Sequence, residues 1–129
     1  MLAPPSLVGE RVLAIGVDVV DVRRFREMEP SVREGVLARL FTANERAECA
    51  TRADPWPHLA ARFAAKEAAV KALASVGITA MPGTEFEVTT DANGAPRLVH
   101  ASKTPRGASW RVSLAHEAEM AIAFCALCG

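Results

Sequence analysis

The sequence predicts one α+β domain, in which an antiparallel sheet packs on a long central helix. The chain has 129 residues, about the usual size of a single domain, and 50% of them are hydrophobic while 23% are charged. After one initial strand pattern, helical patterns come first and strand patterns follow, an order typical of α+β proteins. We therefore expect a single domain over residues 1–129, with residues 1–10 as a loose lead-in.

Residues 12–20 form an apolar run rich in β-branched side chains, which predicts a strand. Because the side chains of a strand alternate between its two faces, the large residues of this run share one face. We expect that face to point into the core, and its residues are Leu13, Ile15, Val17 and Val19. The opposite face carries one carboxylate, Asp18, close to Gly16.

Three helices are expected next, over residues 21–29, 31–40 and 42–52. The first is short because Pro30 stops it. Its outward positions are basic and are occupied by Arg23, Arg24 and Arg26. Thr42 and Glu45 have the spacing of a capping box, in which a hydroxyl and a carboxylate each accept a hydrogen bond from a free amide at the start of a helix.

The pattern over residues 58–75 predicts the longest helix, which Gly77 ends. One continuous face of this helix is made of Ala61, Ala64, Ala65, Ala68, Ala69 and Ala72. Such a face lets the helix axis come unusually close to its neighbour. Two charged pairs flank an apolar strip on the same helix, Arg62 with Lys66 and Glu67 with Lys71.

The remaining chain has the alternation of strands, with antiparallel pairs expected between residues 85–90 and 96–101 and between residues 110–115 and 120–127. A Cys-x-x-Cys spacing occurs at Cys125 and Cys128, within the last of these strands. Residues three apart on a strand point to opposite faces, so we do not expect this pair to form a zinc or redox site.

Composition excludes several classes of function. Lys plus Arg equal Asp plus Glu, so the formal net charge is zero, and aromatic residues make up only 5% of the chain. A nucleic-acid-binding domain is typically basic, so we expect no nucleic-acid partner. No apolar run is long enough to cross a membrane, and we expect a cytoplasmic protein. The glycine motifs of P-loop and Rossmann proteins are absent.

Two carboxylates are the main candidates for chemistry. Asp18 lies near the end of an apolar strand, where a carboxylate is costly to bury without a partner, although Asp18 or Asp21 could simply cap the next helix. Glu67 could simply pair with Lys71 one turn later. Taken together, two carboxylates from separate elements suit Mg²⁺ with a phosphate substrate. Nearby positive charge for phosphate groups would come from Arg62, Lys66 and Lys71.

Histidines add little to this pattern. His116 lies at a strand end beside Glu117, a place where most histidines are simply on the surface. His58 and His100 have no companion residues in the sequence that would suggest a site.

Five segments resemble the holo-acyl-carrier-protein synthases, the short bacterial type of 4′-phosphopantetheinyl transferase. They are residues 16–24 (GVDVVDVRR), 39–45 (RLFTANE), 62–73 (RFAAKEAAVKAL), 94–96 (GAP) and 112–116 (VSLAH). The resemblance extends over about residues 12–127, in order and with similar spacing. It implies the fold of that family and transfer of the phosphopantetheine arm of coenzyme A to a serine of an apo acyl carrier protein.

The resemblance also implies residue roles. Asp18 and Glu67 would hold Mg²⁺ against the coenzyme A pyrophosphate, and Lys71 would neutralise the bridging phosphates. Arg62 and His116 would meet the 3′-phosphate or the nucleotide near it. The base that takes the serine proton would be either Glu67 or a metal-bound water, and we favour the water because Glu67 is already engaged.

The family resemblance further implies a homotrimer with sites at the subunit junctions, where Asp18 and His116 of one chain would meet Glu67 of its neighbour. The basic cluster Arg23, Arg24 and Arg26 would steer an acidic carrier helix, with an ordinary solvated face as the alternative. Arg24 is the best match to the carrier-contacting position.

The sequence departs from the family pattern in two places. Ala95 stands where a basic residue is common, and Glu117 and Glu119 make the corner at His116 more acidic than usual. Neither change removes an expected metal ligand. Two other functions stay open, a non-catalytic coenzyme A or carrier-protein binding module and a subunit whose charged helix serves only assembly.

Overall fold

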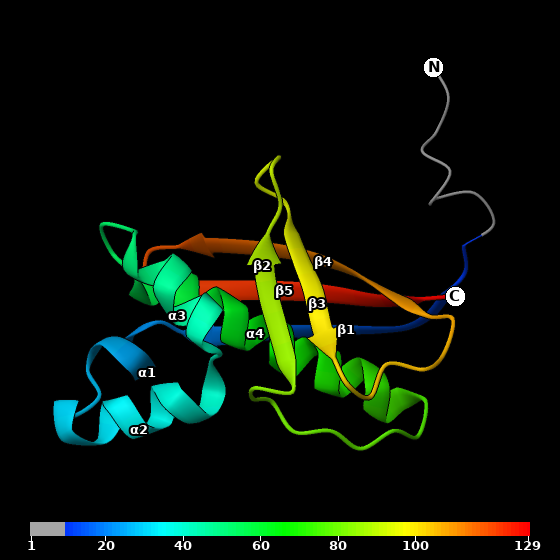
Figure 1. Cartoon of the computed structure of the whole chain (residues 1–129), viewed down its shortest axis with the longest axis horizontal. Coiled ribbons are helices and arrows are strands. Elements are labelled where there is room, and N and C mark those ends of the chain that lie inside the picture. The colour runs from blue at the N-terminus through cyan, green and yellow to red at the C-terminus, as the bar shows by residue number, and fades with distance from the viewer. Residues whose placement is uncertain (1–9) are drawn as a thin grey trace.

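The computed structural model describes residues 10–129 of the chain (Figure 1). Its elements in chain order are β1 (Val12–Asp21), α1 (Arg23–Arg26), α2 (Pro30–Leu40), α3 (Ala43–Ala50), α4 (Trp56–Ser75), β2 (Phe86–Thr90), β3 (Pro96–Ala101), β4 (Ser109–Glu117) and β5 (Met120–Cys128). The predicted α+β class is confirmed, and so is each expected element, with small differences at the ends. Residues 1–9 of the predicted lead-in lie outside the described residues.

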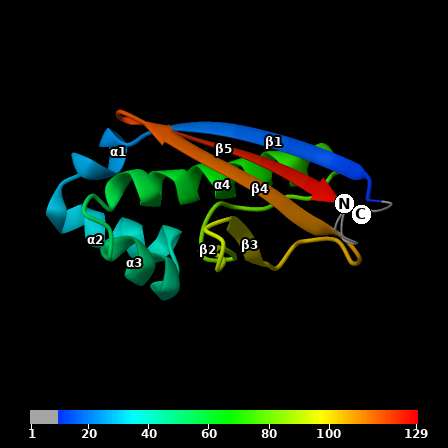
Figure 2. The same ribbon diagram turned by 90° about the horizontal axis from the view of Figure 1, so that it is seen from above.

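The five strands form two separate antiparallel sheets. β1, β5 and β4 form a three-stranded sheet in that order, and β2 pairs with β3 in a separate hairpin. In the view from above, the three-stranded sheet lies on one side of α4, while α2, α3 and the β2–β3 hairpin lie on the other (Figure 2). The long helix is therefore the middle layer of the domain, as the sequence predicted.

Small side chains allow α4 to approach the sheet closely. The alanines of the predicted stripe are buried, and Ala64, Ala65, Ala68, Ala69 and Ala72 are completely inaccessible to solvent. A Cβ atom placed on Gly16 of β1 would lie 1.9 Å from the carbonyl oxygen of Ala68, so only glycine fits at this crossing. This contact sets the distance between β1 and α4 close to Asp18, which lies two residues after Gly16 on the same strand.

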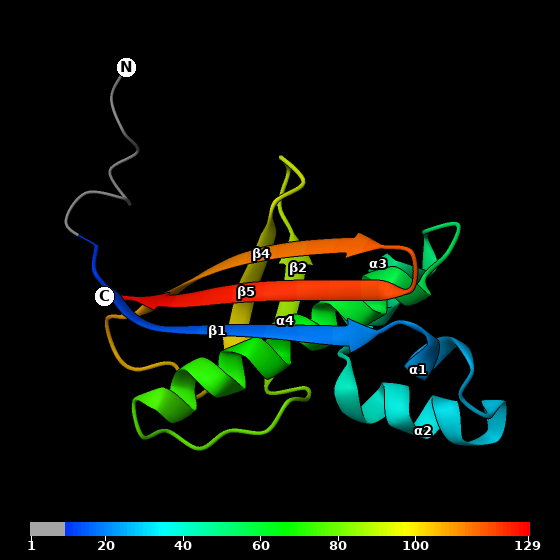
Figure 3. The ribbon, with the colours of Figure 1, turned by 180° about the vertical axis from the view of Figure 1, so that it is seen from behind.

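The predicted orientation of β1 is wrong. The four residues expected in the core face away from α4 and are about half exposed, with Ile15 at 58% and Val19 at 52%, whereas Ala14 and Val20 are buried at 7% and 3%. Where β1 crosses the alanine surface of α4, only small residues such as Ala14 and Gly16 fit on the facing side of the strand. Side-chain size at this crossing therefore decides which face of β1 is the core face. The outer face of the sheet is visible from behind (Figure 3).

The short helices are held by local signals that the sequence contains. α1 has only four residues, shorter than the predicted stretch over residues 21–29, and it buries Phe25. At the start of α3 the predicted capping box is present, with Thr42 and Glu45 accepting each other's backbone amides. Gly77, with φ of 83°, follows the end of α4.

The cysteines and the question of a membrane-spanning helix can be examined for residues 10–129, which the structure describes. Cys49, Cys125 and Cys128 are free and buried, so the Cys-x-x-Cys spacing forms no disulfide. Burial raises the pKa of the Cys125 thiol to about 12, which makes it unreactive. No helix in this part of the chain has the length and apolar character needed to cross a membrane.

Candidate active site

The first group of candidate residues lies where β1 crosses α4. The Lys71 ammonium donates a hydrogen bond of 2.9 Å to Oδ1 of Asp18 and another of 3.1 Å to the carbonyl of Val17. The fold thus brings the helix pair Glu67 and Lys71 to the strand carboxylate, although 53 residues separate Asp18 from Lys71. The sequence predicted that these side chains act together.

The two carboxylates are close enough to affect each other. The pKa of Glu67 is raised, mainly because burial penalises its charged form and also because Asp18 repels it. Arg24 and Lys71 act in the opposite direction on the same carboxyl group. The charged form of Glu67 is therefore disfavoured at this site unless a further cation lies beside it.

The local explanations hold for neither Asp18 nor Glu67, although the capping role is found at Asp21. Asp21, and not Asp18, accepts the backbone amide of Arg23 at the start of α1, at 3.0 Å. Lys71 forms its ion pair with Asp18, and within residues 10–129 no ion pair joins Glu67 to Lys71. Both carboxylates are therefore available for a role beyond capping or a pair along one helix.

Hard oxygen donors of this kind suit Mg²⁺, which commonly binds one or two protein carboxylates and completes its shell with water and substrate phosphate. In the described part of the chain, no cluster of three or more His, Cys, Asp or Glu side chains could hold a metal by itself. The residues present therefore fit an ion that is shared with a substrate better than a closed structural site.

A second group lies at the start of α4 and the end of β4. The ring of His116 packs edge-to-face on the ring of His58, with 5.2 Å between centroids. Arg62, one turn after His58, is only 4% exposed and forms an ion pair of 3.0 Å with Glu48. Its Nε is buried and has no hydrogen-bond partner. The expectation that His58 has no companion is wrong, because the fold places it beside a residue 58 positions later in the chain.

Lys66 is not available as a coenzyme ligand in this structure. Its ammonium is completely buried and donates to Glu45, to the carbonyl of Leu40 and to the carbonyl of Gly83, at 2.7, 2.6 and 3.1 Å. All three of its protons are used, so a phosphate oxygen has none to accept. The charged pair Arg62 and Lys66 faces α3 and the hairpin, and only the Glu67 and Lys71 pair faces β1.

The two groups of residues lie on different edges of the three-stranded sheet. Asp18 is on edge strand β1 and His116 is on edge strand β4, with β5 between them. Along α4, nine residues separate His58 from Glu67, about 13 Å of helix axis. The predicted division, in which Glu67 meets Asp18 of another chain, is wrong, because Asp18 and Glu67 already adjoin within one chain.

The basic cluster on α1 is mostly neutralised by the chain itself. Arg23 pairs with Asp21 at 2.8 Å, and Arg26 pairs with Asp54 and Glu119 at 2.8 and 3.2 Å. Arg24 instead lies over the ring of Phe63, with 5.1 Å between the guanidinium carbon and the ring centroid. Arg24 is thus the arginine of this cluster that no carboxylate of the described chain ion-pairs.

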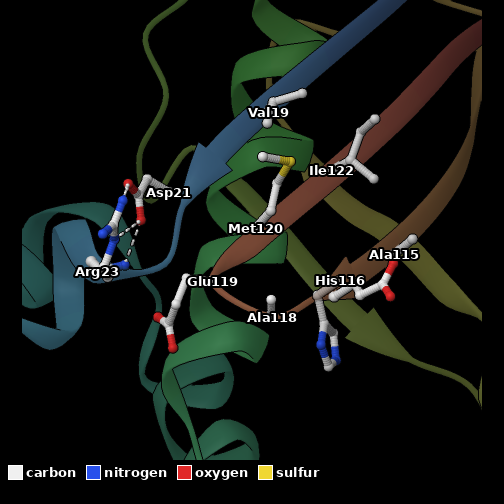
Figure 4. A pocket seen from close by; sticks show the side chains of 10 residues that line it. Val19, Asp21, Arg23, Ala115, His116, Ala118, Glu119, Met120 and Ile122 are labelled. Atoms are coloured by element: carbon white, nitrogen blue, oxygen red, sulfur yellow. Dashed lines mark hydrogen bonds and ion pairs between the residues drawn. The ribbon is translucent and has the colours of Figure 1, made fainter.

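An open groove that the sequence did not predict lies at the end of the sheet. It has a volume of about 840 Å³, and its lining includes Val19, Met120 and Ile122 together with His116 and Arg23 (Figure 4). Asp21 and Arg23 form their ion pair at one side of the groove, and His116 lies at the other. The groove was not predictable from the pattern of β1, because Val19 was expected on the core face.

Comparison with known proteins assigns the class of this fold and site. A profile of the 4′-phosphopantetheinyl transferase superfamily matches residues 14–125, and the chain belongs to this family.

The particular relatives are holo-[acyl-carrier-protein] synthases. That of Desulforudis audaxviator is 38% identical over 119 residues, which are 88% of this chain and 90% of the relative. That of Kocuria rhizophila is 42% identical over 125 residues, with 88% and 89% covered. The crystal structure of the Bacillus anthracis enzyme in complex with CoA (3′,5′-ADP) superposes with a TM-score of 0.74 at 28% identity, covering 92% of this chain and 97% of that one.

Proposed function

We propose that this protein transfers the 4′-phosphopantetheine group of coenzyme A to a serine of an apo acyl carrier protein. The observation that supports this most strongly is the Asp18 and Glu67 pair, which the fold brings together in a member of the phosphopantetheinyl transferase family. The relatives that cover most of the chain are holo-[acyl-carrier-protein] synthases, and one structural neighbour is a complex with CoA.

The reaction is a displacement at phosphorus. The serine oxygen bonds to the phosphorus that carries the pantetheine arm, the bond from that phosphorus to the bridging oxygen breaks, and adenosine 3′,5′-bisphosphate leaves. The serine loses its proton to a base. Phosphoryl transfer of this type depends mostly on positioning and on neutralising negative charge.

Asp18 and Glu67 are the residues that would hold Mg²⁺ in this reaction. When bound, the ion would withdraw charge from the pyrophosphate and stabilise the leaving bisphosphate. Lys71 lies within hydrogen-bond distance of Asp18, so its ammonium is positioned to meet phosphate oxygens placed beside these carboxylates.

The outer face of the sheet supports the expectation that the protein self-associates, as a homotrimer would. It exposes a continuous set of large apolar side chains from β1 and β5, namely Leu13, Ile15, Val17, Val19, Met120, Ile122 and Phe124. An apolar face of this size is typical of a subunit interface. Three such faces around one axis would bring the β1 edge of each subunit near the β4 edge of the next, in a closed head-to-tail ring.

In such a ring, one coenzyme could contact Asp18 and Glu67 of one subunit and His116 of its neighbour. We therefore still propose that the sites lie at subunit junctions, but with Asp18 and Glu67 supplied by the same subunit. A variant that places charge on the interface, Phe124→Glu, should dissociate the assembly in sedimentation experiments and lose transfer activity.

The decisive experiment combines the protein with coenzyme A, Mg²⁺ and an apo carrier protein, and then measures the mass of the carrier. A gain of one phosphopantetheine group, abolished by EDTA and restored by excess Mg²⁺, is expected. A carrier whose acceptor serine is replaced by alanine should gain nothing. If coenzyme A binds but no carrier gains mass, the protein is a binding module, and if coenzyme A causes no thermal shift, it serves only assembly.

Asp18→Asn and Glu67→Gln should each reduce turnover more than about 100-fold. Replacing even a residue that only hydrogen-bonds to a metal ligand typically lowers metal affinity or activity about 10–100-fold. Glu29→Gln, which removes an exposed carboxylate at the start of α2, is the matched control. Turnover close to that of the wild type in either site variant would contradict the metal assignment.

A further inference from the structure

Arg26, the last residue of α1, joins three parts of the fold. Its guanidinium donates two hydrogen bonds to the two carboxylate oxygens of Asp54, at 2.8 and 3.2 Å, and its Nε donates to Oε2 of Glu119 at 3.2 Å. Asp54 lies two residues before α4, and Glu119 lies in the turn between β4 and β5. One side chain therefore connects α1 to the long helix and to the three-stranded sheet.

Both ends of α1 are held by the same residue of that turn. The carbonyl of Glu119 accepts the amide of Val22, which directly precedes α1, at 2.8 Å, while its carboxylate accepts Arg26 at the other end. Between these contacts, Phe25 is buried and packs edge-to-face on two further phenylalanine rings. A helix of a single turn is not stable by itself, so such contacts decide its orientation. Phe25 anchors α1 in the core, and Arg26 fixes its rotation about that anchor.

The contact with Asp54 continues into α4. One oxygen of Asp54 accepts the backbone amide of Trp56, the first residue of α4, at 3.2 Å. The guanidinium carbon of Arg33 lies 4.7 Å from the centroid of the Trp56 ring, and Arg33 also donates a hydrogen bond of 3.4 Å to the Arg26 carbonyl. These contacts form a closed circuit, which fixes the end of α1 to the start of α4.

The elements that Arg26 contacts are the ones that position the carboxylate pair. α4 carries Glu67, and β5, which follows Glu119, pairs with β1, which carries Asp18. Arg24, from the same turn of α1, acts on the pKa of Glu67 and is the arginine expected to meet the carrier. Arg26 thus fixes the carrier side of the candidate site relative to its metal side.

Arg26 differs in this respect from Arg23, although both were expected to steer the carrier. Arg23 pairs with Asp21, only two residues earlier, and so connects no separate elements. The partners of Arg26 lie 28 and 93 positions away in the chain. Two carboxylates already neutralise Arg26, which leaves it little charge to attract an acidic partner. Its geometry suits alignment better than steering.

We propose that Arg26 is a positioning residue for the carrier protein, because through Asp54 and Glu119 it holds α1 at the angle at which a bound carrier presents its serine to the carboxylate pair. The inference rests on the proposed function, which supplies the carrier and the reaction. Displacement at phosphorus needs the attacking oxygen in line with the bond that breaks. A shift of about 1 Å in α1 can therefore cost up to about 100-fold in rate without weakening carrier binding.

The contacts of Arg26 contribute little to stability. The side chains of Arg26, Asp54 and Glu119 are 33%, 47% and 43% exposed, and ion pairs this exposed are weakly stabilising. Phe25 still anchors α1 without them. Substitution should lower the melting temperature by no more than about 4 °C, so the variants stay folded and their rates can be compared.

The test is the single-turnover rate of phosphopantetheine transfer at saturating coenzyme A and carrier, together with the apparent KM for the carrier. Arg26→Lys keeps the positive charge but loses the planar fork that bonds two carboxylates at once. Asp54→Asn removes a negative charge and can still accept the Trp56 amide. Arg46→Lys is the matched control, because Arg46 is also 33% exposed and pairs with Glu34 between α3 and α2.

We expect Arg26→Lys to lower the single-turnover rate about tenfold and to change the carrier KM less than about twofold. Asp54→Asn should lower the same rate, and the double variant should be no slower than the slower single variant, because both substitutions break the same contact. Arg46→Lys should behave as the wild type. A steering role predicts the opposite pattern, with an unchanged rate in Arg26→Lys and a lower carrier KM in Asp54→Asn.

A wild-type rate in Arg26→Lys overturns the inference, and so does an equal loss in Arg46→Lys or a loss confined to the carrier KM. Circular dichroism checks that each variant is folded, and Asp54→Asn provides the same test if Arg26→Lys is not. If the contrary results occur while the wild type modifies the carrier, only the inference fails. If the wild type does not modify the carrier, the proposed function fails and the inference fails with it.

Discussion

Lys71 Nζ lies 2.9 Å from Oδ1 of Asp18, so a lysine of α4 neutralises the carboxylate of β1. The same ammonium is bonded to the Val17 carbonyl at 3.1 Å. It therefore occupies one side of a carboxylate that we expect to bind a divalent cation. Lysine and cation attract the same oxygen, and the phosphates of a substrate offer the lysine an alternative partner.

This competition predicts opposite effects of Lys71→Met on metal binding and on turnover. Without coenzyme A, the midpoint of a Mg²⁺ titration followed by thermal shift should fall several-fold, because a competing positive charge is gone. Turnover should drop at least about tenfold, because a charge-assisted contact to phosphate is lost. Lys103→Met, which removes an exposed lysine bonded to the Thr79 carbonyl, should change neither quantity. Weaker metal binding in Lys71→Met would contradict the competition.

The raised pKa of Glu67 predicts that this residue costs stability. Above the pKa in the folded state, the ionised carboxylate is buried beside Asp18, and this destabilises the protein relative to the unfolded chain. Below the ordinary value of 4.5, both states are protonated and the cost disappears. Metal-free Glu67→Gln should therefore melt about 1–3 °C higher than the wild type at pH 7.

The same difference in melting temperature should shrink as the pH falls below that ordinary value. Excess Mg²⁺ should raise the melting temperature of the wild type and leave the variant unchanged. A variant that melts lower than the wild type at pH 7 would show that Glu67 is stabilised by its surroundings.

Local signals in the sequence were sufficient to predict the helices and strands and part of the candidate site. The capping box at Thr42, the glycine after α4 and the alanine stripe each act through neighbouring residues, so their patterns predicted the structure correctly. Asp18 and Glu67 were also selected together from the sequence, since each is the only acid of its predicted face or helix, and the fold brings them close together. These predictions needed no knowledge of distant contacts.

Long-range packing accounts for the errors. Both faces of β1 carry apolar residues, and only the closeness of the alanine face of α4 determines that Ile15 and its large neighbours point outward. Lys66 looked like a free cation because its partner Glu45 lies 21 residues earlier on another helix. His58 looked isolated because His116 comes from the far end of the chain. In each case the deciding contact joins two elements that no local pattern connects.

Gly16→Ala tests the close crossing of β1 and α4. The new Cβ would lie 1.9 Å from the Ala68 carbonyl oxygen, which is a backbone atom of α4 and cannot move away by a change of rotamer. The strand must move away from the helix, and we expect a loss of about 3 kcal/mol in the free energy of unfolding in urea, the upper end of overpacking costs. Turnover of the folded protein should also fall, because Asp18 moves with the strand.

Gly35→Ala is the matched control for this substitution. Nothing lies within 4 Å of a Cβ at that position, which is in the interior of α2. Alanine is the better helix former there, so a gain of about 0.5–1 kcal/mol is expected. A similar free energy of unfolding for both variants would contradict the close crossing.

Lys66→Met tests whether Lys66 is structural. The substitution leaves the Glu45 carboxylate buried without its cation, although Glu45 still accepts the amides of Thr42 and Val88. Breaking a buried pair from one side costs about 3–5 kcal/mol, measured as a shift of the urea midpoint. The fraction that remains folded should bind coenzyme A with the affinity of the wild type. Lost affinity in a folded variant would restore Lys66 as a coenzyme ligand.

Arg24→Glu tests how the carrier protein is recognised. Arg24 lies over Phe63 and lowers the pKa of Glu67, so it is close to the carboxylate pair. It forms no direct ion pair within residues 10–129. Reversal of its charge should raise the apparent KM for the carrier about tenfold or more and leave the affinity for coenzyme A nearly unchanged. Arg23→Glu is the comparison, because Arg23 is already neutralised by Asp21 and should affect the carrier KM less. Since charge attraction between exposed groups is screened, the difference between the two variants should shrink as salt is raised. If both reversals raise the carrier KM equally at low salt, steering belongs to the whole basic cluster and not to Arg24.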